Sequence, residues 1–318
     1  MVLRRGWRIL PSPPVRPRSK SEPPFEMTRS TILIPRAAGI DRVHAASGNV
    51  LPGIALRWSG LMLVAVSWIS GAIFAAYIIA FFGGAALGGA GERWNESLPD
   101  LYDGRALATT AAIGAHFIAG GVLLLLGPIQ LIGSVRQTIP ALHRWLGRVY
   151  LVSAGLAGLG GLGFIVGRGT IGGTLMDVGF GIYGALMVLC AVMAYAHARA
   201  RNIREHRGWA IRLFALTVGS WLYRMEYGAW FLLTGGAGIG DSFTGWFDAI
   251  MMFFFYIPNL IVAELFIRSR PQDRGTAAGL GTTAVLLLAS TFIVFATWTF
   301  TMRNWGPRMI SGIAEASR

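Results

Sequence analysis

The chain has 318 residues, of which 54% are hydrophobic and only 14% are charged. A soluble protein of this length needs a larger charged fraction to cover its surface, so the composition excludes a soluble globular protein and predicts one embedded in the lipid bilayer. The formal net charge of +13 does not indicate a nucleic-acid-binding protein, because the arginines lie in short segments between apolar runs and form no continuous basic face.

The first segment, residues 1–57, is rich in Pro, Arg and Ser and has no apolar period. This composition predicts a disordered, basic cytoplasmic leader. No apolar run follows Arg4 and Arg5 at the distance typical of a signal peptide, so we expect no cleaved export signal. Met27 is an alternative start site to Met1.

Seven apolar stretches follow, each long enough to supply the roughly 20 residues that a helix needs to cross a bilayer. They cover residues 59–82, 107–132, 148–167, 176–198, 210–234, 245–267 and 277–301. Because the connections are short, successive helices are expected to be antiparallel neighbours in one domain over residues 58–302, with a short tail over 303–318. The sequence therefore predicts an all-α integral membrane protein, a bundle of seven transmembrane helices.

The distribution of positive charge predicts the orientation of this bundle. The leader and every second loop hold 21 of the 28 Lys and Arg residues, the opposite side holds 6, and Arg224 lies inside the fifth helix. Positive residues are enriched in cytoplasmic loops. We therefore expect a cytoplasmic N-terminus and an external C-terminus, in the inner (plasma) membrane of a bacterium.

Ionisable side chains inside a membrane are costly, so each needs a partner or a function. In the outer half of the bundle these are His116 on the second helix and Tyr223, Arg224 and Glu226 on the fifth. Arg224 and Glu226 are two positions apart and cannot share a helix face. The group predicts either an outward-facing polar pocket that binds substrate or interhelical contacts that fix the packing, and both interpretations stay open.

In the inner half, a similar sequence motif occurs twice: HRWLGR at residues 143–148 and HRGWAIR at residues 206–212. His143 and His206 are suitable axial ligands for a b-type haem, and Arg148 and Arg212 are suited to its propionates. The alternative is anchoring at the membrane surface, with Trp at the headgroup level and the basic side chains on lipid phosphates. A haem iron is the one metal that these residues predict.

Two functional hypotheses follow, from different classes. The leading one is a redox membrane protein that uses haem b or a quinone, with His143 and His206 at the cytoplasmic side. The alternative is a transporter or lipid-handling protein whose outward pocket around His116, Arg224 and Glu226 binds a small polar or anionic substrate. A purely structural subunit is a third reading. The lipid bilayer is the expected partner, while a second copy of the chain, a redox partner protein and enzymatic activity all stay open questions.

Three segments also carry a family resemblance. They read HFIAGG and LGPIQ at residues 116–121 and 126–130, HRWLGRVY at 143–150, and HRGWAIRLFAL with LYR at 206–216 and 222–224. Together they resemble the bacterial multi-spanning proteins of domain-of-unknown-function family 2306 over roughly residues 60–270. The resemblance implies a membrane fold and a polar core that includes the residues His116, His143, His206, Arg212 and Arg224. It implies no particular reaction.

Two positions depart from the family pattern. Gly208 stands where the family often has a second basic residue, and Ala210 stands where Met is frequent. Neither departure removes a residue that the haem hypothesis uses as a ligand.

Overall fold

The computed structural model describes residues 50–268 and 276–317, and within these ranges every regular element is a helix, which confirms the all-α class. The elements are α2 (Val50–Tyr77), η1 (Ile78–Gly83), α3 (Gly84–Leu87), η2 (Gly91–Glu96), α4 (Leu107–Leu131), α5 (Gly133–Thr138), α6 (Pro140–Arg168), α7 (Gly173–Arg199), α8 (Ile203–Thr234), α9 (Trp246–Phe254), α10 (Ile257–Arg268), α11 (Thr276–Phe300), η3 (Thr301–Trp305) and α12 (Gly306–Ala316). The predicted leader lies outside the described residues up to position 49, and its last residues belong to α2.

Six helical segments in the described residues are long and apolar enough to cross a membrane. They are Ile54–Leu87, Leu107–Leu131, Pro140–Arg168, Gly173–Arg199, Trp246–Arg268 and Leu280–Ala316. Each overlaps one of the predicted stretches. The remaining stretch, 210–234, lies in the 32-residue helix α8, which is not among the six because it carries polar and charged side chains along an otherwise apolar sequence.

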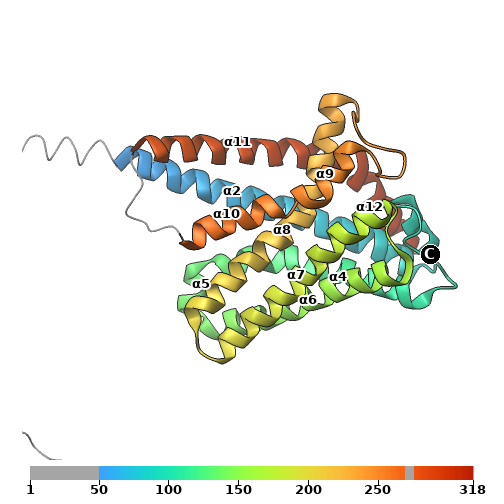
Figure 1. The fold of residues 1–318 in the computed structure, drawn as a ribbon, viewed down its shortest axis with the longest axis horizontal. Coiled ribbons are helices and arrows are strands. Elements are labelled where there is room, and N and C mark those ends of the chain that lie inside the picture. Colours follow the sequence, from blue (N-terminus) through green and yellow to red (C-terminus); the bar gives the residue numbers. More distant parts are fainter. Residues whose placement is uncertain (1–49, 269–275, 318) are drawn as a thin grey trace, which may run out of the picture. The chain divides into compact units, whose positions relative to one another are not determined.

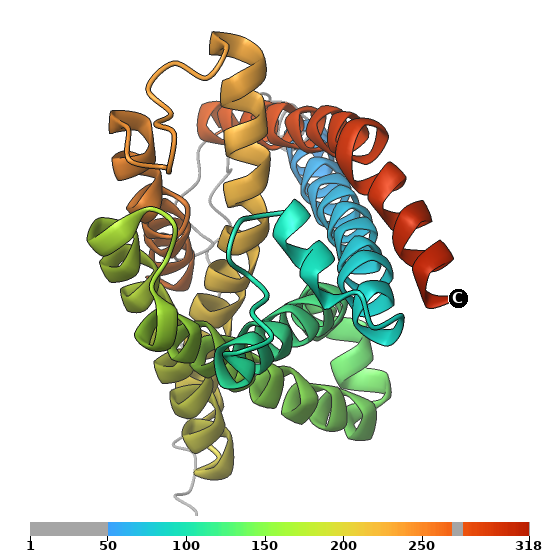
Figure 2. The same cartoon turned by 90° about the vertical axis from the view of Figure 1, so that its right-hand side faces the viewer.

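The first and last of these segments are longer than the sequence predicts. Helix α2 continues through the π-helical turn η1 into α3, and α11 continues through the π-helical turn η3 into α12. Most of the predicted tail over residues 303–318 is therefore helical. Helix α12 packs against η1 and α3 (Figure 2), where a side chain added to Gly84 would clash with the Gly312 carbonyl oxygen. These glycines let the two backbones touch, as in membrane helix pairs generally.

The successive helices from α4 to α8 pack side by side in chain order, whereas α11 packs mainly against α2 and not against its predecessor α10. Helix α4 lies along α6, α6 along α7 and α7 along α8, while α11 lies along α2 (Figure 1). Helix α8 also contacts α4, α10 and α11. Its residues Leu213, Leu216 and Met225 are fully buried. This central position shields the polar side chains of α8, so a helix of lower hydropathy is tolerated within the bundle.

The segment Trp246–Arg268 is broken between α9 and α10, at Phe255 and Tyr256. The backbone of Phe255 packs closely against Gly219 of α8, where an added Cβ would lie 2.6 Å from the Phe255 carbonyl oxygen. Breaks of this kind are tolerated in a membrane only where protein covers the freed backbone groups. The break turns toward the interior of the bundle, and Phe255 contributes to the cavity described next.

Candidate functional site: a cavity inside the helix bundle

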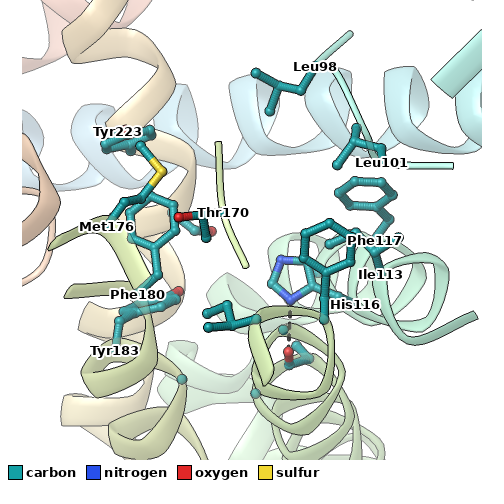
Figure 3. A pocket seen from close by; sticks show the side chains of 18 of the residues that line it. Leu98, Leu101, Ile113, His116, Phe117, Thr170, Met176, Phe180, Tyr183 and Tyr223 are labelled. Carbon is teal, nitrogen blue, oxygen red and sulfur yellow. Dashed lines mark hydrogen bonds between the residues drawn. The ribbon is translucent and has the colours of Figure 1, made fainter. Parts of the chain in front are cut away.

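A cavity of about 340 Å³ lies between α4, α6, α7 and α8. This volume is at the lower end of the ≈ 300–1,000 Å³ range of small-molecule sites. Figure 3 shows Ile113, His116 and Phe117 on one side of the cavity and Phe180 and Tyr223 facing them from the other. The walls are formed mainly by four successive long helices, together with residues 98–101 and Phe255 of the break between α9 and α10, so only the folded bundle creates this space.

Most of the cavity wall is apolar and aromatic. The apolar side chains that line it are Leu98, Leu101, Ile113, Phe117, Leu123, Phe164, Ile165, Ile171, Met176, Phe180, Met187 and Phe255. Glycines at positions 120, 158, 161 and 184 line it as well, and they leave room that larger side chains would fill. A mainly apolar wall with a few polar groups is typical of sites for lipophilic small molecules.

The first of these polar groups is the imidazole of His116. Its Nδ1 lies 2.7 Å from the carbonyl oxygen of Ala157 on α6. A carbonyl oxygen only accepts hydrogen bonds, so Nδ1 carries the proton, and Nε2 of the neutral ring is an acceptor. Gly160 and Gly161 permit this contact, since a Cβ on Gly160 would lie 2.5 Å from the Ala112 carbonyl and one on Gly161 3.3 Å from Nδ1 of His116.

The second is Arg224 of α8. Its Nη1 donates to the Ser220 carbonyl oxygen at 2.8 Å, and its guanidinium lies 5.0 Å from the centre of the Phe74 ring of α2. Among the described residues, no carboxylate oxygen lies within 4.0 Å of an Arg224 nitrogen. The cavity wall therefore contains a cation whose counter-ion is not a side chain of the described chain.

Ion pairs hold one rim of the cavity. Arg168, near the end of α6, bonds Asp100 and Asp103 at 3.2 Å each, which joins α6 to the loop between η2 and α4. The backbone N–H of Arg105 donates to Asp103 at 2.8 Å, and this bond, together with the charge of Arg168, holds the pKa of Asp103 below its ordinary value. At the rim, the arginine thus has carboxylate partners from the described chain, unlike Arg224 in the interior.

The predicted outer group is brought together in part. His116, Tyr223 and Arg224 line the same cavity, whereas Glu226 does not. Two positions along a helix correspond to roughly 200°, so Glu226 faces away from Arg224. Its Oε2 is buried and has no hydrogen-bond partner within the part of the chain that the structure describes.

The residues of the predicted inner group also come together only in part. His143 lies in the first turn of α6 and His206 in the first turn of α8, and the two imidazoles are close enough to interact electrostatically. His206 Nδ1 donates to the Ala194 carbonyl at 2.8 Å. His143 Nδ1 and Gln130 Nε2 are buried and have no partner among the described residues.

The two arginines of the haem hypothesis are placed differently. Nε and Nη2 of Arg212 both donate to Glu264 Oε2, at 3.0 and 2.7 Å, and its guanidinium stacks on Trp209. Glu264 also accepts a bond of 2.6 Å from Arg268. Arg212 therefore already has a carboxylate partner, and Arg148 is exposed on α6. In the described ranges, no three His, Cys, Asp or Glu side chains form a group suited to a metal ion.

Several cavity residues were missed from sequence. On α8, Ser220 lies one turn and Thr217 two turns before Arg224. Phe180 and Tyr183 come from α7. Helical spacing from Arg224 would have pointed to the first two. Nothing in the sequence of α7 distinguishes the face with Phe180 and Tyr183 from a face that packs against another helix, because aromatic side chains serve both purposes.

Comparison with known proteins gives one match. A family model described as predicted membrane protein (DUF2306) matches residues 113–267. No curated protein and no solved structure matches the chain. The matched range includes helices α6, α7 and α8 whole and most of α4, and therefore nearly all of the cavity wall.

Proposed function

We propose that this chain, which belongs to the DUF2306 family of predicted membrane proteins through residues 113–267, binds a small lipophilic molecule in the cavity and serves transport or lipid handling. One observation carries the proposal: a cavity of about 340 Å³ reaches His116 and has Arg224 in its wall. The transport or lipid-handling hypothesis requires such a cavity, and a purely structural role for His116 and Arg224 does not. A quinone is one lipophile of suitable chemistry.

The proposal includes a topology. We take α8 as a seventh membrane span, because it connects the C-terminal end of α7 to the N-terminal end of α9 and is as long as its neighbours. With the leader in the cytoplasm of a bacterial cell, the loops that follow η2 and α6 face outward. The cavity then opens toward the outer side through the rim formed by Asp100 and Arg168.

Thiol labelling tests this topology. Cys190 is buried and is the single cysteine of the chain, so it can be replaced by Ala before one new cysteine is added. Ser242→Cys should react with a membrane-impermeant maleimide on intact cells, and Arg204→Cys only after the cells are opened. The reverse pattern would overturn the proposed orientation, and reaction of both on intact cells would overturn the crossing by α8.

A cavity-filling variant tests the binding function. A Cβ on Gly120 would meet nothing within 4 Å, so Gly120→Leu places its side chain in the cavity without displacing backbone. Gly155→Leu is the matched control, since it also has open space around it but does not line the cavity. In nanodiscs, the wild type and Gly155→Leu should bind radiolabelled decanoate or 1-decanol saturably, and Gly120→Leu should not. Absence of saturable binding to the wild type, or equal binding by all three proteins, would overturn the proposal.

Haem b is a second candidate, favoured by the electrostatic proximity of His143 and His206. The imidazoles fit axial ligation, whereas the propionate partners fit poorly because Arg212 is paired with Glu264 and Arg148 is exposed. A bound haem would supply one-electron transfer. An absorption spectrum of the purified protein, oxidised and then dithionite-reduced, decides the matter: bands of a b-type haem that are lost in His143→Ala support it, and a featureless spectrum with ample haem supply ends it.

A further inference from the structure

We infer that the cavity ligand is an amphipathic monoanion, with a carboxylate bound by Arg224 and an apolar chain against the aromatic wall. The inference rests on the proposed function and specifies its ligand. It starts from the charge of Arg224, for which the described chain supplies no carboxylate within 4.0 Å. An uncompensated cation inside a membrane protein is unfavourable, so an anion bound beside it is stabilised.

Acidic residues at the cavity rim and on helices α8 and α9 are occupied or face elsewhere. Asp100 at the rim is paired with Arg168. Asp248 is fully buried, and it accepts the Tyr227 hydroxyl at 2.7 Å and two backbone N–H groups at 2.8 Å each. Glu226 does not line the cavity. Since the described residues supply no carboxylate for Arg224, we expect the balancing negative charge on a molecule that enters the cavity.

The guanidinium is positioned to receive a carboxylate. Nη1 is held by the Ser220 carbonyl, and the Phe74 ring supports one face of the group. The remaining guanidinium N–H groups have no hydrogen-bond partner among the described residues. A guanidinium presents its donors in a fixed fork that matches the two oxygens of a carboxylate.

A neutral His116 adds no second positive charge to the interior of the cavity. Its Nδ1 lies 2.7 Å from the Ala157 carbonyl oxygen, which only accepts hydrogen bonds, so the neutral ring presents an acceptor at Nε2. The interior of the cavity thus offers one positive charge. Beyond the charged group, the wall is apolar, so a chain of methylene groups gains free energy by leaving water.

A series of matched ten-carbon probes tests the inference. Radiolabelled decanoate, 1-decanol and decyltrimethylammonium differ in headgroup charge, and binding to Gly120→Leu nanodiscs gives the contribution of the lipid alone. We expect decanoate to bind the wild type about 10- to 100-fold more tightly than decanol, as for one charged hydrogen-bonded contact, and the cation to bind most weakly. Acetate at the same concentration should not displace decanoate, because it lacks the chain.

Variants of the two arginines on α8 complete the test. Arg224→Gln should lower the affinity for decanoate to that for decanol, Arg224→Lys should retain part of the preference, and Arg212→Gln should leave it unchanged. Equal affinity of the wild type for decanoate and decanol, or a preference that survives Arg224→Gln, would overturn the inference while leaving the binding function intact. Failure of both probes to bind would instead overturn the proposed function. The wild-type series decides the matter even where a variant does not fold.

Discussion

Two arginines on helix α8 show what the same side chain does in two regions of one membrane protein. Arg212, near the N-terminal end of the helix, gives two hydrogen bonds to Glu264 and stacks on Trp209. Arg224, in the cavity wall, bonds only a backbone carbonyl and lies over Phe74. The chain supplies the counter-ion in the first case and leaves it to a ligand in the second. Whether the chain supplies a carboxylate partner therefore distinguishes an arginine in a stabilising ion pair from one that binds a ligand.

The largest expected effect comes from separating the helices that hold the outer region together. A Cβ on Gly160 would lie 2.5 Å from the Ala112 carbonyl, so Gly160→Leu should force α6 away from α4 and break the bond between His116 and Ala157. Overpacking of this kind costs about 1–3 kcal/mol. Thermal unfolding in detergent should show a clear loss of stability, together with loss of decanoate binding. An unchanged midpoint would contradict the close approach of α4 and α6.

Removing the acid of the inner pair should be the next largest effect. Glu264→Gln leaves both Arg212 and Arg268 without their carboxylate, so the thermal midpoint should fall. The double variant Arg212→Met with Glu264→Leu should recover much of the loss, because it removes both charges together. If the losses of Arg212→Met alone and Glu264→Leu alone simply add in the double variant, the pair does not stabilise the bundle.

Removing Arg224, the corresponding arginine of the cavity wall, should not lower the thermal midpoint. In ligand-free protein, Arg224→Met removes an unbalanced cation and keeps the apolar contact with Phe74, so the midpoint should hold or rise by about 2–4 °C, the shift that corresponds to roughly 1 kcal/mol in a domain of this size. Decanoate should then stabilise the wild type and not the variant. A midpoint that falls as it does in Glu264→Gln would remove the distinction between the two arginines.

The smallest effect concerns the rim, where the pKa of Asp103 is lowered. A carboxyl whose pKa is lowered by folding stabilises the protein above its ordinary pKa of about 4, and this contribution is lost as the pH falls through the lowered value. The wild type should therefore be slightly more stable than Asp103→Asn at pH 6, and the two should converge in strong acid. Melting curves between pH 2.5 and 7 measure this, and a difference that persists at the lowest pH speaks against the ion pair with Arg168 as its cause.

The membrane helices and part of the candidate site can be predicted from the sequence. Apolar runs of sufficient length predict six of the spans because length and hydropathy are local properties. The association of His116 with Arg224 followed from depth along two helices, and both line the cavity. The pairing of Arg212 with Glu264 was not predicted, because it depends on how α8 and α10 rotate against each other. For the same reason the haem hypothesis treated Arg212 as free.

The C-terminal segment shows another limit of local patterns. Residues 306–316 include charged positions and were assigned to a tail, yet they form α12, which packs against η1 and α3. They are held by the close contact of Gly84 with Gly312 and by the bonds of Arg93 to Ser311 and Glu315, residues that are far apart in the chain. A glycine has many roles, and only the fold reveals that these two face each other.

The most direct test of the cavity as a binding site is mass spectrometry of the lipophilic molecules that purify with the protein. Wild type and the control Gly155→Leu should both retain an anionic amphipath in near-stoichiometric amount, and Gly120→Leu and Arg224→Gln should both lack it. If all four proteins carry the same molecules in the same amounts, or if the retained species is neutral, the cavity is not a site for an anionic ligand.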